Sequence, residues 1–111
     1  MNKKTLGVIG LAKRAGKLAV STANVLEAIR GGKAELVLIA SDASCNTKKS
    51  ISDKASYYSV RYEIADITVG ELGHITGRGE AAAAAFTDDS FVKAYEQSLA
   101  ADNTDETERG M

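Results

Sequence analysis

The run Leu36–Ala40 (LVLIA) constrains the fold more than any other segment of the chain. It is a continuous apolar run with a glycine pair upstream and polar residues downstream. Apolar runs of this length, without alternation, are typical of a strand that is buried on both faces. The run therefore predicts the central strand of a sheet that is covered by helices on both sides.

Helical spacing of apolar residues marks the segments around this strand. A helix is expected at residues 3–15, and a second is expected to begin after Ser21 or Thr22 and to end at Gly31. Further helices are expected at residues 44–58, at residues 69–77 after a Thr68/Glu71 capping box, and at about residues 88–100. Shorter strands are expected at residues 17–20 and 62–65. The apolar positions that should face the core are Val8, Leu11, Ala12, Ala15, Val25, Leu26, Ile29, Ile51, Ala55, Tyr58, Phe91, Val92, Tyr95 and Leu99.

Residues 81–86 (AAAAAF) can be interpreted in two ways. Five alanines favour a helix by propensity. The position, between the end of one expected helix and the Thr87-Asp88 cap of the next, favours a strand. Helices and strands otherwise alternate, and this order predicts one domain, residues 1–100, with an α/β architecture. The acidic segment 101–111 (ADNTDETERGM) has almost no large apolar residues and is expected to be a disordered tail.

The charge distribution indicates a candidate binding face. Residues 1–33 carry seven Lys/Arg and one acid, a balance of +6, whereas residues 67–111 carry three Lys/Arg and nine acids, a balance of −6. A chain with a net charge of only −1 can therefore present a basic face to a polyanion. The alternative is that both ends are simply solvated.

Several classes of protein are disfavoured by the sequence. No apolar run approaches the roughly 20 residues of a membrane helix, and no signal-peptide core follows the first lysines, so a cytoplasmic protein without membrane contact is expected. Cys45 is the single cysteine, and His74 is the single histidine. Neither has a sequence signature of a catalytic or metal-ligating partner. We expect no enzyme activity, no metal and no cofactor.

The glycine-containing segments do not match nucleotide-binding loops. Gly31-Gly32-Lys33 and Gly77-Arg78-Gly79 lack the spacing of phosphate-binding motifs, and turns explain both. The basic group Lys13, Arg14 and Lys17 is more informative, because Ser21 and Thr22 follow it at the start of a helix. Basic side chains, hydroxyls and a helix N-terminus are the usual phosphate-contacting set. An ordinary capped helix beside solvated lysines is the alternative.

Six segments of the chain then resemble a known family. They are residues 9–18 (IGLAKRAGKL), 28–44 (AIRGGKAELVLIASDAS), 46–54 (NTKKSISDK), 57–60 (YYSV), 71–80 (ELGHITGRGE) and 86–91 (FTDDSF). In this order and spacing, over about residues 4–100, they resemble small bacterial homologues in the ribosomal protein L7Ae/L30e family, whose members bind kink-turn RNA.

The resemblance implies a three-layer α/β/α sandwich with a mixed four-stranded sheet, in which residues 81–86 form the last strand. It also implies a monomer that binds structured RNA, either a kink-turn or ribosomal RNA, and that can associate with the ribosome. RNA of this kind is recognised by its shape, its phosphates and its unstacked bases. The RNA-contacting residues expected by this resemblance are Lys13, Arg14, Lys17, Ser21, Thr22, Asn24, Glu27, Ser44, Lys48, Gly77, Arg78 and Gly79.

The start of the second helix departs from the family pattern Gly-x-Asn-Glu-x-x-Lys. The corresponding positions hold Ser21, Ala23, Asn24 and Glu27. Glu27 places an anion where relatives have a lysine that faces phosphate, which removes an attraction and adds a repulsion. These departures leave a second hypothesis open, in which the chain keeps the sandwich but serves as a protein-interaction module with weak or no RNA binding.

Overall fold

The computed structural model describes the backbone of residues 1–110 and the side chains of residues 1–100. Within this range the elements follow in the order α1 (Lys3–Arg14), β1 (Leu18–Val20), α2 (Thr22–Arg30), β2 (Leu36–Ala40), α3 (Cys45–Tyr57), β3 (Arg61–Ala65), α4 (Val69–Ile75), β4 (Ala83–Phe86) and α5 (Asp89–Gly110). Helix α5 thus extends past residue 100, where the sequence pattern ended. The expected tail, 101–111, falls on residues whose side chains lie outside the described set, so its disorder stays a prediction.

The strands form one mixed sheet in the order β1-β4-β2-β3 within the described residues. Strand β2 pairs in parallel with β3 and antiparallel with β4, which in turn pairs antiparallel with β1. The apolar run Leu36–Ala40 is therefore an inner strand, and all five of its residues are buried. The predicted mixed sheet with LVLIA at its centre is confirmed.

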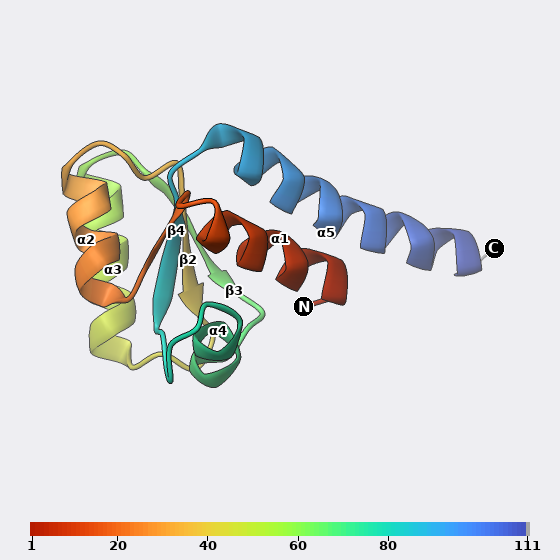
Figure 1. Cartoon of the computed structure of the whole chain (residues 1–111), viewed down its shortest axis with the longest axis horizontal. Coiled ribbons are helices and arrows are strands. Elements are labelled where there is room, and N and C mark those ends of the chain that lie inside the picture. The colour runs from red at the N-terminus through yellow and green to blue at the C-terminus, as the bar shows by residue number, and fades with distance from the viewer. Residues whose placement is uncertain (111) are drawn as a thin grey trace.

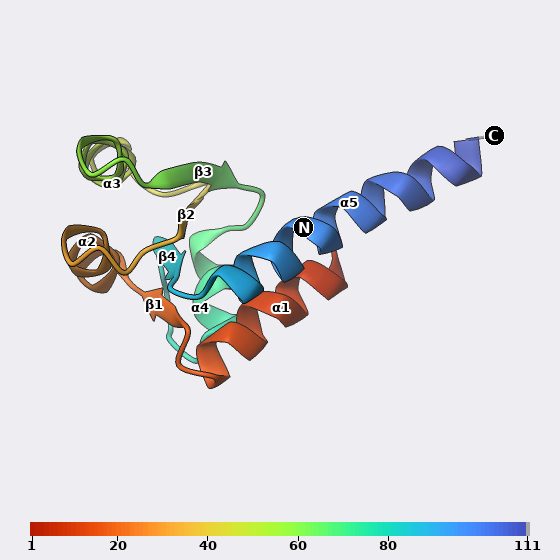
Figure 2. The same cartoon turned by 90° about the horizontal axis from the view of Figure 1, so that it is seen from above.

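Helices cover both faces of this sheet, as the alternation of elements predicted. Figure 2 shows α2 and α3 on one side and α1, α4 and α5 on the other. Val37 and Ile39 of β2 pack toward α2 and α3, with Val25, Ile29 and Ile51. Leu36 and Leu38 point to the opposite face and pack with Ile9, Phe86 and Tyr95. The protein consequently has two apolar layers, one on each side of the sheet.

The alanine-rich segment is a strand, although its composition favours a helix. Residues Ala83–Phe86 lie between β1 and β2 and are fully buried. Their backbone groups pair with both neighbouring strands. The tertiary surroundings outweigh the helix propensity of alanine, which is small for each residue.

Two of the predicted inward-facing stripes are wrong in part. In α1 the buried residues are Thr5, Ile9 and Ala12, whereas Leu11 and Ala15 are exposed. Thr5 fits inside because its hydroxyl lies 2.8 Å from the Ser98 hydroxyl on α5. Tyr58 is also largely exposed, because α3 ends at Tyr57 and the stripe does not continue beyond it.

Candidate nucleic-acid interface

Three helices begin at the same end of the sheet (Figure 1). Ser21, Ser44 and Thr68 are the N-caps of α2, α3 and α4, and each side chain accepts a hydrogen bond from a backbone N–H of the first turn. In α4 the cap is the predicted capping box, since the Glu71 carboxylate also accepts from Thr68 N at 3.0 Å. Polar side chains thus terminate the exposed ends of all three helices.

Backbone hydrogen bonds hold the connecting loops together at this end. The N–H groups donate across strands as follows: Ser21 N to Ala83 O at 3.1 Å, Ala40 N to Ala82 O at 2.8 Å, and Ser41 N to Ile67 O at 2.9 Å. The end of β1, the end of β2 and the start of β4 are therefore adjacent. We name residues 21–24, 41–48 and 77–82 the capped edge.

The capped edge presents two helix N-termini, those of α2 and α3, whose positive dipole ends have no acidic residue in the first turn. Asp42 is already engaged, because its Oδ1 accepts a hydrogen bond from Val69 N at 2.7 Å. Lys48 and Arg78 carry positive charge at the same end, and the carboxylates of Asp42 and Glu80 balance it. Phosphate groups suit such helix N-termini.

Ser21 holds an unusual backbone conformation in the capped edge. Its φ is 91° and its ψ is 155°, a region that is essentially restricted to glycine. Ser21 occupies the glycine position of the family pattern. The surrounding fold therefore imposes a glycine conformation on a residue with a side chain, and such strain costs on the order of 1–3 kcal/mol.

Asn24 is oriented by the strand before its helix. Its Nδ2 donates to Val20 O at 2.9 Å, so the amide nitrogen faces the protein. The side chain is exposed, and its Oδ1 remains the acceptor end of the amide. This orientation suits acceptance of a hydrogen bond from a base or a sugar hydroxyl.

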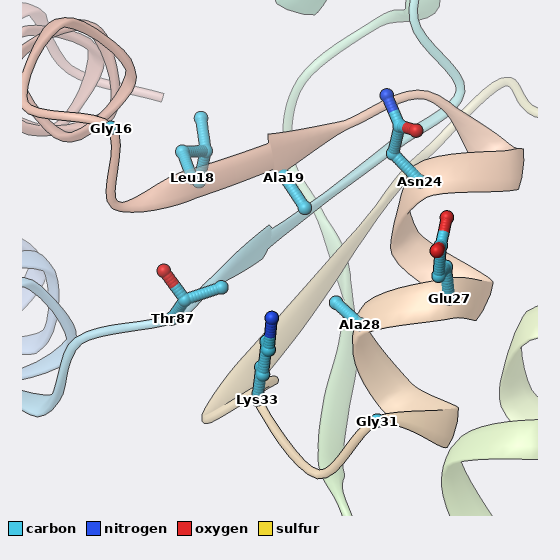
Figure 3. Close-up of a pocket in the computed structure, with 9 residues that line it drawn as sticks. All are labelled: Gly16, Leu18, Ala19, Asn24, Glu27, Ala28, Gly31, Lys33 and Thr87. Carbon is cyan, nitrogen blue, oxygen red and sulfur yellow. The ribbon is translucent and has the colours of Figure 1, made fainter.

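A groove of about 400 Å³ runs beside the capped edge, between α2 and the outer edge of β1 (Figure 3). Asn24 and Glu27 lie at one end, whereas Lys33 and Thr87 lie at the other. The sequence does not identify Lys33 as a site residue, because its glycine-rich surroundings indicate only a turn. The pairing of β2 with β4, in which Glu35 N donates to Phe86 O at 2.7 Å, brings residue 33 near residue 87 and is needed to place it here.

Lys17, which follows the first helix, lies at the opposite end of β1 from Ser21. The Lys17 carbonyl accepts from Thr87 N at 2.9 Å, and Lys17 Nζ lies 4.0 Å from Asp88 Oδ2. The extended chain advances four residue steps from Lys17 to Ser21, a span of about 13 Å. The structure brings these predicted residues to the capped edge: Ser21, Thr22, Asn24, Ser44, Lys48, Gly77, Arg78 and Gly79. Lys17 lies at the other end of the sheet, and Glu27 lies in the groove between. Lys13 and Arg14 are the last residues of α1, and Arg14 lines a separate hollow with His74 and Ile75 of α4.

The loop before β4 is shaped by a glycine that the sequence did not single out. Gly77 has a φ of 78°, and Arg78 N donates to Gly73 O at 2.8 Å. A Cβ atom on Gly73 would lie only 2.6 Å from Glu80 Cα. Gly73 in α4 thus permits the 77–80 loop to fold back against the helix. In the sequence, the role of Gly73 is indicated only by the spacing of the glycines in GHITGRG. That spacing is informative only when the 77–80 loop is known to fold back on α4.

The described part of the chain contains neither a candidate metal site nor a candidate membrane span. Among those residues, no group of three or more His, Cys, Asp or Glu side chains is arranged to hold a metal ion. None of the helices searched in the same residues has the length and apolar character needed to traverse a bilayer.

Fold and edge together define a three-layer α/β/α protein whose helix N-termini gather at one end of a mixed sheet. The chain belongs to the ribosomal protein L7Ae/L30e/S12e/Gadd45 family, whose family model matches residues 3–95. The resemblance inferred from the sequence is thereby confirmed.

Two relatives in curated collections carry the same name. The chain is 50% identical over 58 residues to the RNA-binding protein YlxQ of Enterococcus faecium, a match that spans 52% of this chain and 56% of that protein. It is 38% identical over 84 residues to the RNA-binding protein YlxQ of Bacillus subtilis (strain 168), spanning 76% of this chain and 83% of that protein. The first match therefore covers only a little more than half of the relative.

Solved structures show the same architecture. A Bacillus halodurans protein of unknown function superposes with a TM-score of 0.77 at 29% identity, covering 86% of this chain and 96% of that one. The Giardia lamblia 15.5kD RNA binding protein superposes with a TM-score of 0.70 at 19% identity, covering 87% of this chain and 86% of that one. The second likeness concerns the fold alone.

Proposed function

We propose that this protein binds structured RNA of the kink-turn type through its capped edge and performs no catalysis. The observation that carries the proposal is the convergence of the α2 and α3 N-termini, without acids in their first turns, at one end of the sheet. The family and the names of the two bacterial relatives support an RNA ligand. Those names describe binding proteins and not enzymes.

Each part of the capped edge has a role in this proposal. Lys48 and Arg78 contact phosphates together with the α2 and α3 N-termini. Ser21, Thr22 and Asn24 approach sugars or base edges, where hydroxyl and amide groups form hydrogen bonds. The residues that support these contacts are Ser44, which caps α3, and Gly77 and Gly79, which let the loop approach the RNA.

The groove extends the proposed RNA path away from the capped edge. Lys17 contacts phosphates at the far end of β1, where its amine also lies near Asp88. Lys13 and Arg14 contact phosphates from the end of α1. Glu27 lies along this path and repels the backbone, so this protein binds more weakly than relatives with lysine at that position. The proposed partner is ribosomal RNA in the cytoplasm. If the protein binds ribosomal RNA, it also associates with the ribosome.

The direct experiment is a fluorescence titration with a kink-turn RNA and with a straight duplex of matched length and composition. We expect the kink-turn to bind more tightly, and we expect the affinity for it to fall as salt rises, because phosphate contacts release counterions. Equal affinity for both RNAs at every salt concentration would contradict recognition of the bend.

A second candidate function is supported by the departures in α2. Ala23 lacks a polar side chain, and Glu27 exposes a carboxylate in the groove. A protein-interaction module would tolerate both substitutions. If the titration detects binding to neither RNA, the protein-interaction module becomes the better-supported function.

A further inference from the structure

Strand β3 is an outer strand of the sheet that exposes apolar side chains. Within the described residues it pairs with β2 alone. Tyr62 and Ile64 are 42% and 50% exposed, whereas their register partners Val37 and Ile39 are completely buried. Outer strands of soluble proteins are usually shielded against pairing with other chains. On β3, the side chains that continue the buried layer of β2 are instead partly exposed to solvent.

Two tyrosines at the end of the neighbouring helix are exposed as well. Tyr57 and Tyr58 end α3, which covers the same face of the sheet, and their ring centroids are 5.0 Å apart. Tyr57 is 81% exposed. Four of the five large hydrophobic side chains that are exposed in the described residues thus lie on or beside β3, and the fifth is Leu11 in α1. We name Tyr57, Tyr58, Tyr62 and Ile64 the β3 patch.

The other face of β3 is charged and tied to α5. Arg61 Nη2 lies 2.8 Å from Glu96 Oε2, and the Tyr95 hydroxyl donates to Glu63 Oε2 at 3.1 Å. Along the strand, apolar residues toward α3 therefore alternate with charges of opposite sign toward α5. This alternation makes β3 complementary to a reversed copy of itself.

We propose that β3 pairs antiparallel with β3 of a second copy of this chain, about a two-fold axis at Tyr62. In this register Arg61 of each copy lies opposite Glu63 of the other, and Ile64 lies opposite Val60. Directly opposed residues in an antiparallel pair lie on the same face, close enough for ion pairs and apolar contacts. A register centred on Glu63 would instead oppose two carboxylates, which is unfavourable.

The pairing has consequences for the whole molecule. It joins two sheets of the order β1-β4-β2-β3 into one, through an interface that uses the same surface on both copies, as two-fold dimers do. The α3 helices of both copies lie on one face, so the β3 patch is covered. Because β3 runs parallel to β2, the two capped edges point to opposite ends of the joined sheet. The monomer expected from the sequence is replaced by a dimer with two separated binding edges.

Sedimentation velocity over a concentration series tests this proposal with the full chain. We expect the average mass of the wild-type protein to rise from one chain toward two as concentration increases. Ile64→Lys should keep the mass of one chain throughout. Leu11→Lys makes the same change at an exposed apolar residue far from β3 and should behave as wild type. A wild-type protein that stays a single chain, or a dimer that survives Ile64→Lys, would overturn the proposal.

Charge reversals test whether the two strands pair in this register or associate only through their apolar side chains. Arg61→Glu should abolish the dimer, since it opposes two acids, and the double variant Arg61→Glu/Glu63→Arg should restore it. Circular dichroism verifies that each variant is folded. A double variant that is folded but monomeric would overturn the register. RNA affinity for each protomer should be the same in Ile64→Lys as in wild type, and a loss of RNA binding without a change in mass would assign the β3 patch to RNA instead.

Discussion

Gly73 and Glu80 are in direct backbone contact: a Cβ atom at residue 73 would lie 2.6 Å from the Glu80 Cα. The contact locks the loop that carries Arg78 against helix α4, whose residue Gly73 accepts a hydrogen bond from Arg78 N at 2.8 Å. The shape of the capped edge therefore depends on a residue that itself contacts no ligand.

Gly73→Ala should consequently destabilise the protein and displace the loop. We expect a loss of about 2 kcal/mol of unfolding free energy, because the clash is with backbone atoms that cannot rotate away. Urea unfolding measures it. Gly70→Ala in the same helix is the matched control, since its nearest neighbour would lie at 4.0 Å, and it should be neutral or stabilising. Equal losses for both variants would show that helix content, and not the clash, is responsible.

Ser21→Gly should stabilise the protein. Relief of the φ of 91° outweighs the weak cap hydrogen bond, which spans 3.4 Å from Asn24 N to Ser21 Oγ. The net gain should be about 1 kcal/mol, since strain of this kind costs more than a Ser-to-Gly change at a cap. Ser44→Gly is the control: Ser44 has a φ of −62°, so only the cap is lost and stability should fall slightly. A loss of stability in Ser21→Gly would contradict the assignment of strain.

Stability at high pH should depend on Tyr95. Burial, followed by the charge of Glu63 and the hydrogen bond to it, raises the pKa of the Tyr95 phenol above its ordinary value. The folded state therefore retains a proton that the unfolded state loses above about pH 10. The stabilisation is fully present below that pH and is lost as pH rises toward the folded pKa, with a slope of at most about 1.4 kcal/mol per pH unit.

Tyr95→Phe removes this titration. The variant should be less stable than wild type at neutral pH by about 1 kcal/mol, because the hydrogen bond to Glu63 is lost. Its unfolding free energy should fall less steeply above pH 10. Parallel pH profiles for the two proteins would contradict a raised pKa at Tyr95.

The sequence predicted the elements well where several local signals agreed. The LVLIA run combined an apolar pattern with flanking turn residues, and the Thr68/Glu71 pair formed the capping box that its spacing indicated. Residues 81–86 show the limit of this reasoning: composition favoured a helix, and only their place in the order of elements favoured the strand that forms.

The site was harder to predict, because it depends on which ends of which strands are neighbours. Lys17 is close to Ser21 in the sequence, but an extended strand places the two at opposite ends of β1. Lys33 is distant in the sequence from Thr87, which lines the same groove. Gly73 is close in the sequence to Arg78 and Glu80, but it meets them only because the loop folds back against α4. Periodicity assigns residues to faces, whereas it says nothing about the order of strands in the sheet.

The departures in α2 give a prediction about affinity. Glu27→Lys replaces a repulsion in the groove by an attraction and should strengthen binding of a kink-turn RNA about ten-fold at most, since an exposed charge is screened by water and salt. The gain should be largest at low salt. Ala23→Asn should add a smaller gain that depends less on salt, through a hydrogen bond to a base edge. If neither variant binds more tightly, helix α2 does not face RNA.

The central claim, that the capped edge faces RNA, is tested most directly by backbone NMR. The measurement follows the amide resonances of the isotopically labelled protein as a kink-turn RNA is added. We expect shifts concentrated in residues 21–24, 41–48 and 77–82, with smaller shifts along the groove toward Lys17 and Lys33. The amide resonances of residues 92–99 in α5 should not shift. The capped edge does not face RNA if its resonances are unaffected while shifts fall on α5, or on β3 and the end of α3.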